Sequence, residues 1–241
     1  MTEYSVYCHM ATSIDGKVTG EYLLDSRFAP FDTDWNTIFH KLNSKMKNWI
    51  AGRVSFDEII PKVDLDLSDF IGKTVNRNDY MGDYQNGDKV AIALDPDGKL
   101  SWSKSRIGDE YPELKGDHIV TILSESVSDA YLLYLQSIGV SYVFAGQKNP
   151  LSMKLALDKL HQLFGITEFL LVGGGIINGS FMQEGLIDTI SLIQAPLVES
   201  QSDSVSLFQA NQSTQPLPQY KVTKNELLPT GALYLIYEKV E

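Results

Sequence analysis

The stretch EFLLVGGGIINGSF, from Glu168 to Phe181, decides the fold of this chain. Its first part predicts a buried β-strand over residues 168–172, and the part after the glycines predicts a short helix over about 177–184. Gly173, Gly174 and Gly175 fill the junction. Glycines let backbone N–H groups approach a ligand closely, and the following helix N-terminus favours an anion. The junction therefore has two interpretations: a turn that binds a pyrophosphate, or a tight turn without a ligand.

The same alternation of strand and helix extends outward through most of the chain. Short apolar or alternating runs predict strands at residues 4–10, 49–51, 89–94, 118–123, 140–145, 187–195, 221–228 and 232–240. Helical spacing and caps predict helices over 35–49, from 126 or 128 to 138, and over 152–164. Such alternation indicates an α/β fold with a mostly parallel central sheet between two helical layers. The helix-free C-terminal end predicts antiparallel strands at one edge.

Length and composition favour one folded domain. The chain has 241 residues, of which 43% are hydrophobic and 21% charged, as is ordinary for a globular protein. This length suits one large α/β domain or two small ones. Because no repeat or linker divides the sequence, we predict a single domain over residues 1–241. The polar segments 64–88 and 199–219 are predicted to be excursions from it, either functional lids or mobile loops.

Charge and cysteine content exclude several classes of protein. Lys and Arg number 20 against 31 Asp and Glu, a net charge of −11, which disfavours a nucleic-acid surface but allows a small anionic ligand. The single cysteine, Cys8, excludes a disulfide framework and is predicted to lie in the core. The scattered histidines predict no metal site. No apolar run is long enough to span a membrane and the start lacks signal-peptide features, so a cytoplasmic protein is expected.

Two further loops follow predicted strands. Gly52-Arg53-Val54-Ser55 offers a guanidinium fork for a phosphate and a hydroxyl that could cap a helix from Phe56. Taken alone, it is better explained as a capped turn beside a solvated arginine. Ala11-Thr12-Ser13-Ile14-Asp15-Gly16-Lys17 follows the first strand. Ligands of open α/β sheets bind beyond the carboxyl ends of strands. Asp15 is therefore predicted either to form a turn or to hold a substrate group and organise a proton donor.

These loops occur in an order that resembles the dihydrofolate-reductase-like superfamily. The ordered set is Ala11–Lys17, Ile50–Ser55, Phe169–Gly175, Gly185-Leu186-Ile187-Asp188 and Ala195-Pro196. It is most similar to the reductase domain of the bifunctional riboflavin-biosynthesis protein and its stand-alone relatives. The resemblance covers the chain from the first strand to about Pro196. It implies a reductase that uses NADPH, with NADH as the alternative, and that forms a homodimer.

The resemblance also implies roles for single residues. Gly52, Arg53 and Ser55 would lie at the cofactor phosphates, and Leu94 and Asp95 near the adenosine. Near the pyrophosphate and nicotinamide it places Gly173, Gly174, Gly175 and Ile176. Ala11 and Asp15 would lie near the nicotinamide and substrate. Asp15 is the candidate catalytic residue, as the proton source or as the organiser of that source. Asp32 and Asp34 are predicted as helix caps, and Asp34 is a reserve candidate for proton relay.

The sequence also departs from the riboflavin-type reductases at the substrate half of the site. Their usual Glu before the glycines is Val172 here, their Thr in the phosphate turn is Ser55, and the acidic residue four positions later is Ile59. After the Leu-Asp of the adenosine strand they often have Ser, where this chain has Pro96. A zinc-deaminase signature is absent, because that signature needs two cysteines and this chain has one. The substrate contact at Val172 is therefore expected to be apolar.

These features lead to one prediction and three alternatives. The prediction is an NAD(P)H-dependent reductase that transfers a hydride to a C=N or C=O carbon of a small heterocyclic or sugar-derived substrate. The alternatives are the riboflavin-pathway reductase of 5-amino-6-(5-phosphoribosylamino)uracil, a dihydrofolate reductase, and a nucleotide-binding protein that kept the fold and lost the chemistry. No nucleic acid, membrane or metal ion is expected as a partner.

Overall fold

The computed structural model describes residues 3–59, 63–148, 151–210 and 217–240. It divides the chain into two compact units. The first unit contains residues 1–46 and 168–241, and the second contains residues 47–167. The single domain expected from the sequence stays a prediction. Within the described residues, no helix is long and apolar enough to cross a membrane.

The first unit is built on a mixed sheet whose strands run in the order β6-β1-β7-β9-β8. β1 pairs in parallel with β6 and β7, whereas β9 is antiparallel to both β7 and β8. The predicted antiparallel strands at the C-terminal end are thereby confirmed. The bounds are β1 Ser5–Thr12, β6 Glu168–Leu171, β7 Thr189–Gln194, β8 Tyr220–Leu227 and β9 Leu233–Lys239.

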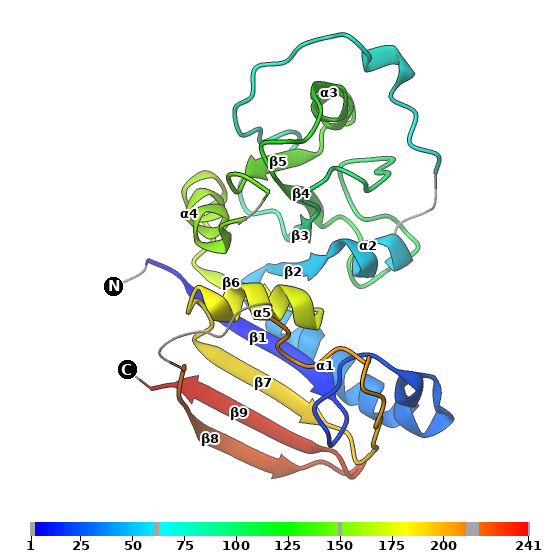
Figure 1. Ribbon diagram of the computed structural model, residues 1–241, viewed down its shortest axis with the longest axis vertical. Helices are drawn as coiled ribbons and strands as arrows, with labels where there is room; N and C mark the ends of the chain where they lie inside the picture. Colours follow the sequence, from blue (N-terminus) through cyan, green and yellow to red (C-terminus); the bar gives the residue numbers. More distant parts are fainter. Residues whose placement is uncertain (1–2, 60–62, 149–150, 211–216, 241) are drawn as a thin grey trace. The chain divides into compact units, whose positions relative to one another are not determined.

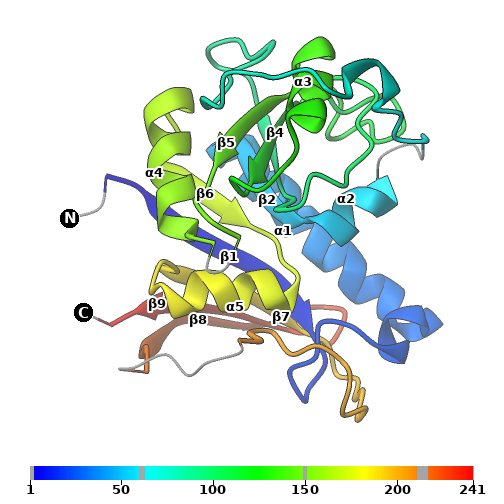
Figure 2. The ribbon, with the colours of Figure 1, turned by 45° about the horizontal axis from the view of Figure 1, so that its top comes forward.

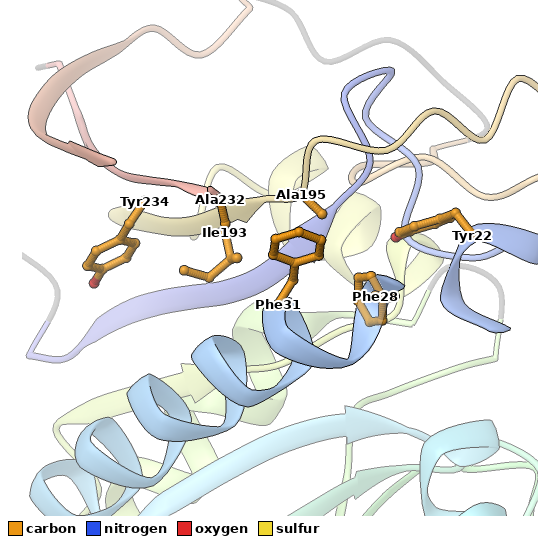
Figure 3. Packing of buried hydrophobic residues seen from close by; sticks show 7 residues of the cluster. All are labelled: Tyr22, Phe28, Phe31, Ile193, Ala195, Ala232 and Tyr234. Carbon is orange, nitrogen blue, oxygen red and sulfur yellow. The ribbon is translucent and has the colours of Figure 1, made fainter. Parts of the chain in front are cut away.

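Helices α1 (Ala29–Met46) and α5 (Gly175–Gln183) cover opposite faces of this sheet (Figures 1 and 2). Short 3₁₀ turns, η1 (Glu21–Leu24) and η2 (Ser26–Phe28), lead into α1. Figure 3 shows how the start of α1 packs against the sheet. Aromatic rings from this region lie against β7 and β9 in a cluster of Tyr22, Phe28, Phe31, Ile193, Ala195, Ala232 and Tyr234.

The first helix begins earlier and ends earlier than its apolar spacing predicts. It starts at Ala29, and Pro30 suits the first turn because that turn needs no amide donor. Asp32 and Asp34 therefore lie inside α1, and their prediction as caps before it is wrong. Lys47 has a left-handed backbone, with φ of 57°, which ends the helix. Trp49 consequently lies buried in a strand and not on the helix face where the periodicity placed it.

The second unit contains four parallel strands in the order β5-β4-β3-β2. The strands are β2 Asn48–Gly52, β3 Val90–Leu94, β4 His118–Leu123 and β5 Ser141–Phe144, and every residue in them is buried. The helices are α2 Arg53–Ile59, α3 Asp129–Ser137 and α4 Met153–Phe164, with a 3₁₀ turn η3 at Ser68–Phe70. The predicted N-terminal caps Ser128 of α3 and Ser152 of α4 are confirmed, because each hydroxyl accepts a backbone N–H from the first turn of its helix. Gly165, in the left-handed region, ends α4 as predicted.

The excursion over residues 64–88 folds back onto β5, the last strand of this series. Tyr80 and Tyr142 exchange two backbone hydrogen bonds of 2.9 and 2.8 Å, and the Asp79 carboxylate accepts the N–H of Phe144 at 2.8 Å. A strand at the end of a sheet otherwise presents unpaired backbone groups. This part of the excursion is therefore a cover for the β5 edge, where the sequence suggested a lid or a mobile loop.

Candidate functional site

In the first unit, the predicted site loops follow the carboxyl ends of neighbouring parallel strands. Cys8 of β1 pairs in register with Leu171 of β6, the last residue of that strand. The glycine turn, residues 173–175, follows β6 directly, and the loop containing Asp15 follows β1. Ala11 lies near the end of β1, paired with Ile193 of β7. The structure therefore brings the loops after β1 and β6 to the same edge of the sheet, where ligands of α/β folds bind.

The three glycines of the turn have different surroundings. A Cβ atom on Gly174 would meet nothing within 4 Å, whereas one on Gly175 would lie 1.9 Å from the carbonyl oxygen of Ser206. Gly173 has φ of 98° and its peptide bond to Gly174 is cis. Helix α5 begins at Gly175, two residues earlier than predicted, with Gly174 as its N-cap. Only Gly174 of the three borders open space, so it is where a ligand can approach the backbone.

Apolar side chains flank this turn. Val172 is half-buried between β6 and the glycines, and Ile176 is 63% exposed in the first turn of α5. An isoleucine this exposed beside an open glycine offers apolar contact surface to a planar ring. The predicted roles of Val172 toward substrate and of Ile176 toward cofactor remain predictions.

Asp15 is held as a charged anchor. Its two carboxylate oxygens accept the backbone N–H groups of Glu199 and Ser200, each at 3.0 Å. The bond from Glu199, the Ser13 side chain and the bond from Ser200 lower the pKa of Asp15 to about 2. The side chain is ionised at neutral pH and has no proton to donate. Of the two roles predicted for Asp15, proton source or organiser, the geometry favours the organiser.

In the second unit, the other predicted residues follow β2 and β3, which lie side by side. Gly52 pairs in register with Leu94, so Arg53 and Asp95 both follow carboxyl ends. Helix α2 starts at Arg53, which places Ser55 inside the helix. The prediction that Ser55 caps a helix starting at Phe56 is therefore wrong. A hydroxyl two residues into a helix is turned away from the free N–H groups that a cap would bind.

Arg53 and Asp95 are both engaged with neighbours in this unit. The guanidinium of Arg53 forms an ion pair with Asp57, one turn further along α2. Asp95 is fully buried, and its Oδ2 accepts the N–H groups of Lys99 at 2.6 Å and Leu100 at 2.8 Å. Burial raises the pKa of Asp95. Its Oδ1 is buried and has no hydrogen-bond partner among the described residues.

Asn178 is not among the predicted site residues, and the segment after residue 199 was predicted only as an excursion. Asn178 lies in α5, fully buried, and its Nδ2 donates to the carbonyl oxygen of Leu207 at 3.0 Å. A polar residue on the apolar face of a short helix was the available signal.

The reserve candidate Asp34 accepts a 2.5 Å hydrogen bond from the Thr230 hydroxyl, in the turn between β8 and β9. Cys8 is buried as predicted, and burial raises the pKa of its thiol.

Comparison with known families matches this arrangement. The family model described as the RibD C-terminal domain matches residues 4–234, nearly the whole chain. The chain belongs to this family. The resemblance seen in the sequence is thereby confirmed, and so is the α/β fold class with mostly parallel strands and antiparallel strands at the C-terminal edge. Membership in the RibD C-terminal domain family makes the chain an oxidoreductase of the reductase type. No curated protein matches the sequence.

Solved structures share the fold at low sequence identity. A pyrimidine reductase-like protein from Corynebacterium diphtheriae has a TM-score of 0.68 at 17% identity, over 99% of this chain and 92% of its own. The riboflavin biosynthesis reductase of Saccharomyces cerevisiae has a TM-score of 0.64 at 11% identity, over 100% of this chain and 92% of its own. The bifunctional deaminase/reductase of Thermotoga maritima has a TM-score of 0.61 at 14% identity, over 98% of this chain and 57% of its own. The RibD-type chain thus spans little more than half of the bifunctional protein.

Proposed function

We propose that this protein is an NADPH-dependent reductase of the riboflavin-pathway type, acting on a C=N or C=O carbon of a small sugar-derived heterocycle. The observation that carries the proposal is the open space at Gly174, at the carboxyl edge of the first unit's sheet. A backbone free of side chains there allows a pyrophosphate to approach the first amides of α5. Family membership supports the reaction class.

Within each unit, taken by itself, residues fit groups of a reduced dinucleotide. Gly174 offers room for the pyrophosphate, and the apolar surface of Ile176 suits the face of a nicotinamide. In the second unit, Arg53 offers a permanent cation for a phosphate, and Asp95 follows β3, where the resemblance places the adenosine. NADPH, when bound, supplies the hydride. The protein supplies orientation and exclusion of water.

Asp15 acts in this proposal through the loops that it holds. Its ionised carboxylate fixes the backbone at Glu199 and Ser200 against the loop after β1. This arrangement keeps the end of β1, with Ala11, in a single conformation for substrate and nicotinamide. The proton that accompanies the hydride comes from a group other than Asp15, because that carboxyl is ionised at neutral pH.

The test is a pair of measurements on the purified protein. Titration with NADPH and NADH measures cofactor binding, and the loss of reduced-nicotinamide absorbance with 5-amino-6-(5-phosphoribosylamino)uracil and with dihydrofolate measures turnover. Binding of NADPH with turnover of the uracil derivative, even at the low rate that Val172 leads us to expect, supports the proposal. Binding without turnover of either compound would favour a nucleotide-binding protein, and absence of binding would refute the proposal.

We also expect the protein to form a homodimer, as its resemblance to the riboflavin-type reductases implies. Light scattering during size-exclusion chromatography measures the mass of the species in solution. A mass equal to one chain at all concentrations tested would contradict this expectation.

A further inference from the structure

We propose that Asn178 is a positioning residue that sets the glycine turn through a strap, residues 204–209. The proposal rests on the proposed function and concerns the same site. Asn178 touches neither the open space at Gly174 nor the predicted cofactor. It acts by joining the turn to a segment that is distant in sequence.

The strap is bonded along its length to the loop after β1. The N–H of Val18 donates to the Val205 carbonyl oxygen at 2.8 Å, and the N–H of Leu207 donates to the Gly16 carbonyl oxygen at 3.0 Å. The Lys17 ammonium donates to the carbonyl oxygen of Ser204 at 2.8 Å. Figures 1 and 2 show this orange segment running beside the blue loop and the start of α5. Residues 204–209 of the predicted excursion over 199–219 are therefore hydrogen-bonded to the loop after β1 and form the strap.

The strap also lies directly on α5, where glycines make room for it. A Cβ on Gly175 would lie 1.9 Å from the carbonyl oxygen of Ser206, and a Cβ on Gly179 would lie 2.1 Å from that of Gln209. The N–H of Gln209 donates to the Gly175 carbonyl oxygen at 2.9 Å. Glycine inside a helix lowers helix stability, so two glycines on one face of α5 indicate a close backbone contact.

Asn178 connects the strap to the turn. Its backbone N–H donates to the carbonyl oxygen of Gly174 at 3.0 Å, and its Nδ2 donates to the carbonyl oxygen of Leu207 at 3.0 Å. The side chain is fully buried. A change that removes the Nδ2 donor leaves the Leu207 carbonyl without this bond and loosens the strap, which then keeps the Gln209–Gly175 bond to α5. The backbone bond to Gly174 remains in such a variant, so the side chain acts on the turn through the strap, which lies directly against Gly175.

Asp15 holds the chain just before the strap, because its carboxylate accepts the N–H groups of Glu199 and Ser200. The strap thus ties the loop after β1 to the glycine turn. The two loops keep a tight relative placement while the Asn178 side chain adds its bond to that between Gln209 and Gly175. Loss of the strap should weaken cofactor binding more than it slows the chemical step.

The experiment compares Asn178→Asp and Gly179→Ala with Ser180→Ala as the control. Asn178→Asp keeps the shape but places an oxygen against the Leu207 carbonyl. Gly179→Ala displaces the strap without touching Asn178. Ser180 is in the next position of α5, and its hydroxyl donates to the Ile176 carbonyl oxygen within the same helix. Either of the first two variants tests the proposal if the other fails to fold.

The first readout is hydrogen exchange of the strap amides of Val205, Leu207 and Gln209, which does not depend on NADPH. Both variants should speed this exchange, and the control should not. The second readout is steady-state kinetics. Both variants should raise the KM for NADPH by roughly tenfold, with kcat changed less, as expected for loss of one buried hydrogen bond.

The third readout is the pH dependence of the KM. A buried carboxyl facing a carbonyl oxygen has a raised pKa, and once protonated it donates again. The KM defect of Asn178→Asp should therefore shrink as the pH falls, whereas that of Gly179→Ala should not. Unchanged exchange, or faster exchange with unchanged KM, would overturn the proposal. If wild-type protein does not bind NADPH, the proposed function fails, and exchange at Gly175 and Ile176 in the two variants still decides whether the strap sets the turn.

Discussion

Arg53 and Asp57 form an ion pair one helical turn apart on α2, and both side chains are about two-fifths exposed. The pair neutralises the cation that the sequence assigns to a cofactor phosphate. An exposed pair at this spacing contributes only about 0.3–0.5 kcal/mol, so an incoming phosphate can displace the carboxylate. Asp57 therefore acts as a competitor for Arg53.

Removing that competitor should strengthen cofactor binding. Asp57→Asn is expected to lower the Kd for NADPH by roughly two- to fivefold, because the pair no longer has to be broken and a like charge leaves the phosphate. The matched control is Glu58→Gln, which removes the same charge from the exposed neighbouring position. Equal gains in the two variants would mean that only the net charge matters. If NADH binding gains as much as NADPH binding, Arg53 contacts the pyrophosphate and not the 2′-phosphate.

A side chain at Gly174 should block the cofactor without unfolding the protein. Gly174 has φ of −72°, which any residue adopts, and open space around its Cβ position. Gly174→Val is expected to weaken NADPH binding at least about tenfold, or ~1.4 kcal/mol, with little change in Tm. Gly175→Ala provides the contrast, because its methyl group meets the Ser206 carbonyl and should lower the Tm. Unchanged affinity in folded Gly174→Val would remove Gly174 from the site.

NADPH should be preferred over NADH. The resemblance to NADPH-dependent reductases and the cation at Arg53 favour a cofactor with an additional phosphate. The carboxyl of Asp95 is occupied at Oδ2 by the turn that follows it, so it is less free to select a ribose hydroxyl than its position after β3 suggests. Side-by-side titrations measure the preference. Equal or tighter binding of NADH contradicts it.

Val172 should limit the use of the riboflavin intermediate. The related reductases usually place Glu at this position, and a site that lacks one hydrogen-bonding partner discriminates strongly against the substrate that needs it. Wild-type turnover of the phosphoribosylaminouracil is expected to be weak, and Val172→Glu should raise its kcat/KM. Val172→Gln is the uncharged control. Efficient wild-type turnover would show that another residue makes this contact.

Acid should destabilise the protein partly through His118. Burial, and then the charge of Arg106, lower the pKa of this histidine to about 4, from about 6.5 in an unfolded chain. Its Nε2 bonds the Ser141 hydroxyl at 2.6 Å, while its buried Nδ1 has no partner among the described residues. Since only the unfolded state takes up the proton between these values, stability present above about pH 6.5 falls as the pH drops toward 4. Urea unfolding of His118→Gln should show a shallower loss over this range.

The sequence predicts elements well where local chemistry decides them. Helix α4 runs from its Ser152 cap to Gly165 as predicted, because a hydroxyl cap and a left-handed glycine act within a few residues. The helical spacing that reached Trp49 failed because a single backbone angle at Lys47 interrupts it. Nothing local at Lys47 signals that angle.

The candidate site was predicted in its residues but not in their contacts. The glycine turn and the loop with Asp15 were found because glycines and a strand end are local signals. The partners of Asp15 lie about 184 positions away, and they are backbone N–H groups that any residue carries. The strap was predicted as a lid or a mobile loop for the same reason: its bonds to residues 16–19 and to α5 use the main-chain atoms of the strap.

The cover that Tyr80 places over β5 bears on how the protein can be handled. β5 is the last of four parallel, fully buried strands. If its outer edge were bare, its unpaired backbone groups could pair with other chains. Deleting residues 79–84 to shorten the long excursion would expose it and favour inclusion bodies on expression. A tag inserted after Lys73, where residues 71–74 are exposed, would leave intact the Tyr80–Tyr142 pairing and the bonds of Val75 and Arg77 to Asp129, so we expect soluble yield to be kept.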